Sequence, residues 1–225
     1  MSVVLFVSAT NTNIGKTTCT RELAKICNTQ GIKTILLKPI ETGVSLLDKS
    51  SDAHLFLKDN QVLDSSLQLN DISIYRYNKA CAPLIAQQEE NPSMPIKLNK
   101  IKDLIEHFKQ RYDLVIVEGA GGLLVPITLK ESMLDLALKL QAKLLLISHD
   151  NLGMINDCLL NDYLLKSQKL DYKIAINLRE DNTPIFESVS LPYIKQFNKH
   201  ALNPILIFQK DLKKLMDFII KPLTH

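Results

Sequence analysis

The sequence lacks the cysteine and histidine spacing of a metal site or a disulfide framework. It contains four cysteines, far apart and without a Cys-x-x-Cys pair: Cys19, Cys27, Cys81 and Cys158. We interpret them as ordinary buried thiols in a reducing compartment. The five histidines show no ligand or catalytic-triad spacing, and no Gly-x-Ser-x-Gly motif is present. We therefore assign the histidines no catalytic role.

Long apolar runs and an excess of charge of one sign are also missing. No uninterrupted apolar stretch approaches the roughly 20 residues of a membrane span, and the N-terminal segment turns polar after Val7, too soon for a signal peptide. The net charge is +3, with Lys and Arg scattered among Asp and Glu. We expect a cytoplasmic protein whose partner is a small molecule, not nucleic acid or a membrane. The length of 225 residues favours a single domain, residues 1–225.

What the sequence does contain is a series of short, nearly continuous apolar runs. They occupy residues 3–7, 34–37, 114–117, 144–147, 174–176 and 205–208. Runs without polar alternation are typical of strands covered on both faces of a parallel sheet. Segments with helical apolar spacing lie between them, such as residues 19–27, which Gly31 closes, and residues 101–108. The alternation predicts an α/β protein with a doubly wound, mainly parallel sheet, which binds ligands at the carboxyl ends of its strands.

Two regions complete this outline. Residues 44–95 are less regular and contain three prolines, so we expect substrate-facing loops and short helices there. Residues 211–220 are predicted to form a last amphipathic helix.

The first apolar run leads into a polar loop that ends in Gly15-Lys16-Thr17, and a predicted helix follows. This is the context of a P-loop, in which backbone N–H groups surround phosphate, the lysine reaches the terminal phosphates and the hydroxyl binds Mg²⁺. The spacing is that of a variant P-loop, with Ala9 where a glycine normally stands, so Ala9 must adopt a backbone conformation that accepts a methyl group. The alternative is a chance Gly-Lys-Thr with a solvated lysine. The predicted nucleotide-binding residues of the loop are Asn13, Ile14, Gly15, Lys16, Thr17 and Thr18.

A second signal follows the run at residues 114–117, which leads into Glu118 and then Gly119-Ala120-Gly121-Gly122. In P-loop proteins an acid at the tip of a buried strand beside the loop helps to hold magnesium, and small residues after it let phosphate approach the backbone. A dinucleotide-binding Gly-x-Gly-x-x-Gly motif is less consistent with Leu124 and Pro126. We therefore predict that Glu118, Gly119 and Gly121 belong to the nucleotide site.

Five motifs in the same order resemble those of the dethiobiotin synthetases of biotin biosynthesis, over about residues 3–194. They are the variant P-loop, Lys38-Pro39, Ser51-Asp52-Ala53, residues 117–122 and Gly153-Met154-Ile155-Asn156. The resemblance implies a P-loop NTPase-like fold and an ATP-dependent cyclo-ligase. Its expected reaction is carboxylation of 7,8-diaminopelargonic acid by CO2 and ring closure to dethiobiotin, through a carbamate and a carbamic–phosphoric anhydride, with release of ADP and phosphate.

Two other classes of P-loop protein deserve comparison. A regulatory ATPase that dimerises on nucleotide and acts by binding partners is the alternative, although such proteins usually carry a further lysine near the beginning of the loop, where this chain has Ala9-Thr10-Asn11-Thr12. An amide-forming synthetase of the cobyrinate type would need a glutamine-hydrolysing domain, for which 225 residues leave no room.

The resemblance also assigns catalytic and metal-binding roles. Because the reacting species are anions, the site needs cations and backbone donors more than a nucleophile. The resemblance places Lys38 at the carbamate and the transferred phosphoryl group, beside Lys16, and makes Thr42 the contact to the amine or carbamate. Without the resemblance, a lysine just past a strand such as Lys38 is usually only a solvated cap. Magnesium would be held by Thr17, Asp52 and Glu118, although Asp52 alone would also suit a helix N-cap.

For the organic substrate, the resemblance assigns two contact regions. Backbone groups around Ala82 and Pro83 would form part of the substrate loop. Gly153 and Asn156, at a predicted helix start, would hold the substrate carboxylate from the partner subunit, since a helix N-terminus suits an anion. The expected assembly is therefore a homodimer with sites across its interface.

The nucleotide base is the least defined part of the resemblance. Asn177 stands where the family places an asparagine at the adenine, but Leu178 follows where an acidic residue often stands. Residues 191–193, Leu-Pro-Tyr, resemble the strand and loop that cover the base, which would place Pro192 there. Preference for ATP over other triphosphates stays open. We expect exchange of the base to affect KM more than kcat, because the base lies far from the reacting phosphate.

Overall fold

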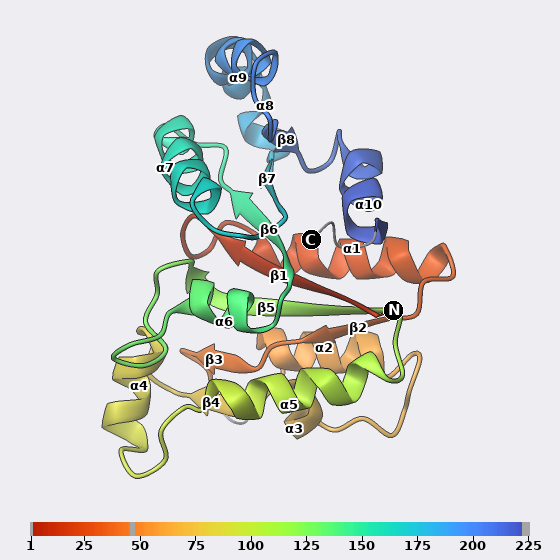
Figure 1. Cartoon of the computed structure of the whole chain (residues 1–225), viewed down its shortest axis with the longest axis vertical. Helices are drawn as coiled ribbons and strands as arrows, with labels where there is room; N and C mark the ends of the chain where they lie inside the picture. Colours follow the sequence, from red (N-terminus) through yellow and green to blue (C-terminus); the bar gives the residue numbers. More distant parts are fainter. Residues whose placement is uncertain (1, 46–47, 222–225) are drawn as a thin grey trace.

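A six-stranded parallel sheet forms the centre of the molecule in the computed structural model, which describes residues 2–45 and 48–221. Its spatial order is β2-β5-β1-β6-β7-β8 (Figure 1). The strands are β1 (Val3–Ala9), β2 (Thr34–Leu37), β5 (Leu114–Gly122), β6 (Lys143–Ser148), β7 (Tyr172–Ile176) and β8 (Leu206–Ile207). All neighbouring pairs are parallel, with β1 at the centre between β5 and β6.

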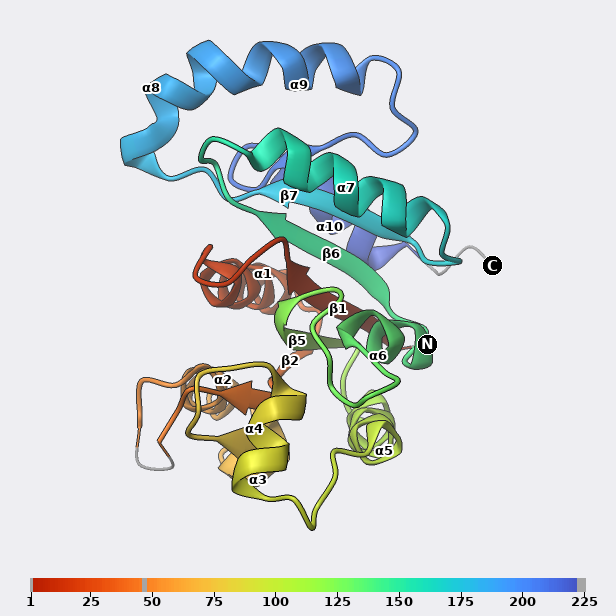
Figure 2. The same ribbon diagram turned by 90° about the vertical axis from the view of Figure 1, so that its left-hand side faces the viewer.

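Helices cover both faces of this sheet; Figure 2 shows α1 and α6 on opposite sides of it. The longer helices are α1 (Lys16–Thr29), α2 (Asp52–Asn60), α4 (Pro83–Glu90), α5 (Leu98–Lys109), α6 (Met133–Lys139), α7 (Met154–Lys166), α9 (Leu191–Asn198) and α10 (Leu212–Ile220). Shorter turns are α3 (Leu69–Ile72), η1 (Glu180–Asn182), α8 (Thr183–Ile185) and η2 (Phe186–Ser190). Across the described residues, no helix has the length and apolarity needed to cross a membrane. The predicted doubly wound α/β class is confirmed.

The predicted strands and the first helix are confirmed, with shifted ends. β1 is buried along almost its whole length, and Ala9 ends it in ordinary extended pairing, which explains why a methyl group is accepted there. α1 buries the predicted stripe of Cys19, Leu23 and Cys27. Gly31 follows the helix at φ 81°, the left-handed conformation that terminates helices at low cost. The last helix begins one residue later than predicted, at Leu212.

The strand β5 is longer than the apolar run predicted. It continues through Glu118 to Gly122, so the acid lies within the strand and pairs with Val7 of β1. The register between β1 and β5 shifts between Val7 and Ala9, opposite the glycine-rich end of β5.

The region predicted to hold loops and short helices contains α2, α3 and α4, together with a small parallel sheet that the sequence did not indicate. This second sheet pairs β3 (Ile40–Thr42) with β4 (Tyr75–Tyr77). Strands of three residues are too short to show a periodicity. Residues 46 and 47 of this region lie outside the described part.

The expected strand and loop at residues 191–193 is wrong. These residues begin the helix α9, and Pro192 occupies its first turn, where a missing N–H costs no helical hydrogen bond. Pro192 and Tyr193 are exposed, and Ile194 is the buried residue of the helix. In Figure 2, α8 and α9 lie beyond α7, at the end of the molecule away from β2.

Candidate active site

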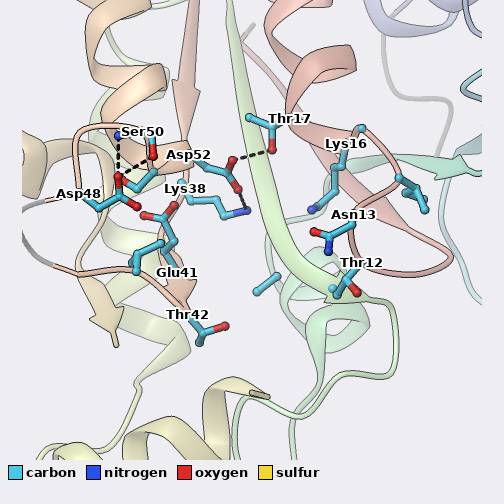
Figure 3. A pocket seen from close by; sticks show the side chains of 16 residues that line it. Thr12, Asn13, Lys16, Thr17, Lys38, Glu41, Thr42, Asp48, Ser50 and Asp52 are labelled. Atoms are coloured by element: carbon cyan, nitrogen blue, oxygen red, sulfur yellow. Dashed lines mark hydrogen bonds and ion pairs between the residues drawn. The ribbon is translucent and has the colours of Figure 1, made fainter. Parts of the chain in front are cut away.

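The carboxyl ends of the three neighbouring strands β2, β5 and β1 converge on one cavity. Lys38 follows β2, Gly121 lies near the end of β5 and the P-loop follows β1, while Glu118 and Asn177 lie beside the lining residues. The cavity has a volume of about 550 Å³ (Figure 3). Its lining includes the P-loop, the segment from Lys38 to Val44, the start of α2 and Gly121. The sequence had predicted a site at this edge of the sheet.

The P-loop leads into the N-terminus of α1, where backbone N–H groups have no partner within the helix. Gly15 precedes the helix at φ 80°, and no side chain among the described residues caps this helix start. The first N–H groups of α1 therefore stay available for an anion. Asn13 also has a positive φ, 58°. Thr18, predicted as a nucleotide contact, lies exposed in the first turn of α1.

Asn177 packs directly on this loop. Its Nδ2 donates to the Ile14 carbonyl at 2.9 Å, and its Oδ1 accepts from Gln209 Nε2 at 2.7 Å. A Cβ atom on Gly15 would lie 2.3 Å from Asn177 Nδ2, so any other residue would have to displace this amide and adopt the left-handed φ of 80°. Gln209 was missed by the sequence analysis, since it belongs to no motif. Its Oε1 also accepts from the backbone N–H of Leu178 at 3.2 Å.

Five predicted side chains meet beside the loop in one polar network. Thr17 Oγ1 lies 2.9 Å from Asp52 Oδ1 and 3.0 Å from Glu118 Oε1. Lys38 Nζ donates to Asp52 Oδ2 at 2.9 Å and to Glu118 Oε1 at 2.6 Å. Lys16 Nζ lies 3.4 Å from the same Glu118 oxygen. Asp52 is the first residue of α2 and Ser51 is its N-cap, which leaves the Asp52 carboxylate free to face this network.

Burial and neighbouring charges set the ionisation of the network. Burial alone would lower the pKa of Lys38, but the Glu118 and Asp52 carboxylates raise it above its ordinary value. Burial and the nearby Lys38 ammonium lower the pKa of Lys16. Burial opposes ionisation of Asp52, yet Lys38 holds the pKa of this carboxyl below its usual range. Lys38 and Asp52 therefore favour each other's charged forms, whereas burial and Lys38 disfavour the charged form of Lys16.

The donor set fits a magnesium ion. Thr17 supplies a hydroxyl oxygen, and Asp52 and Glu118 supply carboxylate oxygens, the ligands that this hard cation prefers. Glu118 Oε2 is buried and has no hydrogen-bond partner within the described parts of the chain. The ammonium of Lys38 compensates the same two carboxylates that a cation would bind.

Glu41 is a buried acid of the cavity that the sequence analysis missed. It lies on β3 between Ile40 and Thr42, and its side chain lines the cavity with that of Thr42. Glu41 Oε1 accepts from the Ala53 N–H at the start of α2, at 3.3 Å. Burial raises the pKa of Glu41 above its ordinary value.

The predicted substrate contacts at Ala82, Pro83, Gly153 and Asn156 are not among the described residues that line the cavity. Ala82 and Pro83 begin α4, and the preceding loop is tied to the end of β3, where the Gly43 N–H donates to Lys79 O at 3.0 Å. Gly153 and Asn156 lie at the exposed start of α7. Pro192 lies in α9 and does not line the cavity either.

Comparison with known proteins places the chain in a family. A family model described as an AAA domain matches residues 4–205. The ATP-dependent dethiobiotin synthetase BioD of Helicobacter pylori strain J99 is 68% identical over 219 residues, which cover 97% of this chain and 100% of that protein. The chain belongs to the dethiobiotin synthetase family. The dethiobiotin synthetase BioD of Wolinella succinogenes is 36% identical, over 85% of this chain and 88% of its own length.

This chain also shares its fold with more distant proteins. The MinC:MinD cell division protein complex of Aquifex aeolicus contains a chain with a TM-score of 0.55 and 19% identity, covering 97% of this chain and 85% of that one. At this identity the likeness shows the fold alone. It therefore gives no support to a regulatory role over a synthetase role.

Proposed function

We propose that this member of the dethiobiotin synthetase family carboxylates 7,8-diaminopelargonic acid with CO2 and closes the ring of dethiobiotin, at the expense of ATP. The observation that carries the proposal is the 68% identity, over the full length of the relative, to a protein named for this activity. The convergence of Lys16, Lys38, Asp52 and Glu118 beside the P-loop supports it.

The cations of the site suit the anions of this reaction. A substrate amine captures CO2 as a carbamate, which becomes an electrophile only after phosphorylation. The P-loop N–H groups and Lys16 would bind the phosphates, and Lys38 would orient the carbamate and the transferred phosphoryl group. Thr42 lines the same cavity as Lys38 and would contact the amine or carbamate. The second amine would then attack the carbamic–phosphoric anhydride and expel phosphate.

Thr17, Asp52 and Glu118 would hold magnesium in this reaction. When bound, the ion would supply positive charge that neutralises part of the charge of the phosphates. The ammonium of Lys38 lies 2.9 Å from Asp52 Oδ2 and 2.6 Å from Glu118 Oε1, so it would share these two carboxylates with the ion.

We also propose a homodimer in which Gly153 and Asn156 complete the partner's site at the substrate carboxylate. An apolar stripe on the outside of α7 supports this assembly. Leu152, Leu160 and Tyr163 are 97%, 61% and 83% exposed, and with Asn156 they are spaced four, four and three residues apart. Asn156, Leu160 and Tyr163 lie within α7, where residues at this spacing share one helix face, and Leu152 precedes the helix. The proposed substrate contact therefore lies on the same helix face as two exposed apolar side chains.

A cytoplasmic location follows from the same proposal. The reaction consumes ATP, and the four cysteines are free thiols, as expected in a reducing compartment. The base specificity stays a prediction: Asn177 is close enough to the P-loop to reach a bound nucleotide, while its amide is already engaged by Ile14 and Gln209.

The test is product identification. Purified protein is incubated with ATP, Mg²⁺, [¹³C]bicarbonate and 7,8-diaminopelargonic acid, and the products are identified by mass spectrometry. We expect dethiobiotin with one ¹³C in its ureido carbon. Hydrolysis of ATP without any labelled product, at a rate indifferent to the diamine, would instead support the regulatory ATPase.

A further inference from the structure

We propose that the carboxylate of Glu41 binds one of the two amino groups of the substrate and makes the site select amines over neutral groups. This inference rests on the proposed function, and it adds a specificity-determining residue to the site. It concerns recognition of the diamine rather than ATP cleavage.

The first support is an incomplete hydrogen-bond set in a buried carboxylate. Glu41 is only 3% exposed, and one oxygen, Oε1, accepts from the Ala53 N–H. The other oxygen, Oε2, is buried and finds no hydrogen-bond donor in the described ranges 2–45 and 48–221. A buried acceptor without a donor costs free energy that a bound ligand can recover. Because Glu41 lines the cavity, a ligand there can supply that donor.

The second support is the distribution of charge around the cavity. Lys38 forms its ion pairs with Asp52 and Glu118, and no described cation pairs with Glu41. In the view of Figure 3, Glu41 and Lys16 lie on opposite sides of the Lys38 ammonium. The cavity therefore presents cations toward the P-loop and, toward β3, a carboxylate that forms no direct ion pair with a described cation and feels the Lys38 ammonium only at longer range.

This polarity matches a substrate that carries two amino groups on adjacent carbons. The amine that captures CO2 becomes a carbamate anion. Lys38 attracts this anion, whereas the Glu41 carboxylate would repel it. The other amino group keeps its N–H donors and, when protonated, its positive charge. Glu41 Oε2 would accept a hydrogen bond from that amino group. The site would therefore distinguish the two nitrogens by charge, with the free amine at Glu41 and the carbamate at Lys38.

Stabilisation of the start of α2 does not by itself explain why a carboxylate is buried at position 41. Ser51 already caps this helix, since its Oγ accepts from the His54 N–H at 3.4 Å. Glu41 Oε1 adds a second acceptor at the same helix start, but Oε2 takes no part in it. Ser51→Ala is therefore a matched control that weakens the helix start while leaving the Glu41 charge in place.

The experiment measures binding of two ligands to the full-length protein by isothermal titration calorimetry. The ligands are 7,8-diaminopelargonic acid and 7,8-dihydroxynonanoic acid, in which uncharged hydroxyl groups replace both amines. In Glu41→Gln we expect the Kd of the diamine to rise by about tenfold to a hundredfold, the usual weight of a hydrogen bond to a charged group. The Kd of the diol and the Kd of ATP should stay nearly unchanged. Glu41→Asp, which keeps the charge, should recover part of the selectivity for the diamine.

The outcomes separate the possible roles. Equal weakening of diamine and diol by Glu41→Gln, as expected of Ser51→Ala, would show that Glu41 only supports α2 and would overturn the proposal. An unchanged diamine Kd in Glu41→Gln would also overturn it while leaving the proposed function intact. A wild-type protein that binds ATP but not the diamine would refute the proposed function itself, and this inference with it.

Discussion

At the scale of single residues, the site depends on charges that compensate one another. Glu118 is fully buried, and its Oε1 lies 2.6 Å from Lys38 Nζ and 3.4 Å from Lys16 Nζ. A buried carboxylate is tolerated only when nearby cations and donors replace its hydration. Lys38 therefore contributes to stability as well as being the proposed catalytic cation.

We expect Lys38→Met to lower the free energy of unfolding by about 3 kcal/mol, because removing one member of a buried ion pair leaves the other charge uncompensated. Urea denaturation in the presence of EDTA measures this change. The double variant Lys38→Met/Glu118→Gln should recover much of the loss, since both charges are then removed. A Lys38→Met protein as stable as the wild type would refute the view that Lys38 compensates Glu118.

Gly15 and Gly31 form a matched pair for testing the P-loop. Both have left-handed backbones, at φ 80° and 81°, but an added Cβ would meet Asn177 Nδ2 at 2.3 Å only at Gly15, and nothing within 4 Å at Gly31. We expect Gly31→Ala to cost about 1 kcal/mol of stability through backbone strain and to bind ATP normally. Gly15→Ala should lose most of its ATP affinity, measured by calorimetry. Equal ATP affinity in the two variants would contradict this account.

Lys16, Thr17 and Glu118 could be found from the sequence, because each belongs to a motif that follows or ends a predicted strand. Lys38 and Asp52 were assigned through the family resemblance. Glu41 and Gln209 could not be found in either way, since their contacts with the start of α2 and with Asn177 arise only when distant segments fold together. The four predicted contacts at Ala82, Pro83, Gly153 and Asn156 stay predictions, because the described cavity of one chain does not include them.

At the scale of elements, the sequence predicted the strands and helices that are long enough to show a periodic apolar pattern. The central strands and the helices α1, α5 and α10 are long enough to show their apolar pattern. The three-residue strands β3 and β4 are not. The start of α9 was misassigned because Leu-Pro-Tyr suits either a strand end or a helix start, and the choice depends on packing of Ile194.

A buried carboxylate joins the loop after β6 to the segment after β7. Asp150 Oδ2 accepts from the Arg179 backbone N–H at 2.8 Å, and Oδ1 accepts from the Arg179 guanidinium at 2.8 and 3.0 Å. Burial opposes ionisation, but Arg179 holds the pKa of Asp150 below its ordinary value. The stabilisation is therefore present above the unfolded pKa of about 3.9 and is lost as the pH falls through the lower folded value.

We expect Asp150→Asn to lower the free energy of unfolding at pH 7 by about 1–2 kcal/mol, a modest value because the Arg179 side chain is half exposed. Thermal or urea unfolding as a function of pH measures it. The difference from the wild type should shrink below about pH 4. A difference that stays constant from pH 7 to pH 3 would show that the Asp150 charge is not responsible.

At the scale of the whole molecule, one six-stranded sheet and one continuous hydrophobic cluster run through the described residues, with the small sheet of β3 and β4 beside them. The single domain over residues 1–225 stays a prediction. The proposed homodimer would bury Leu152, Leu160 and Tyr163. It would also bring Asn156 to the partner's site, where it would supply the contact to the substrate carboxylate.

We expect Tyr163→Asp to convert a dimer into monomers and to reduce turnover of the diamine, because it places a charge in the apolar interface. Size-exclusion chromatography with light scattering gives the oligomeric state. Leu202→Asp is the control, since Leu202 is 93% exposed outside this stripe and its replacement should leave the dimer intact. A wild-type protein that is monomeric and fully active would rule out the shared site.

We propose that the Lys38 network beside the P-loop drives carboxylation of a diamine. The most direct test of this claim is phosphate release from ATP with Mg²⁺ and bicarbonate, with and without 7,8-diaminopelargonic acid, for the wild type and Lys38→Ala. We predict turnover that requires the diamine and falls by about a thousandfold or more in the variant, as for loss of a group that stabilises transition-state charge. Phosphate release that ignores the diamine, or that survives in Lys38→Ala, would contradict the claim.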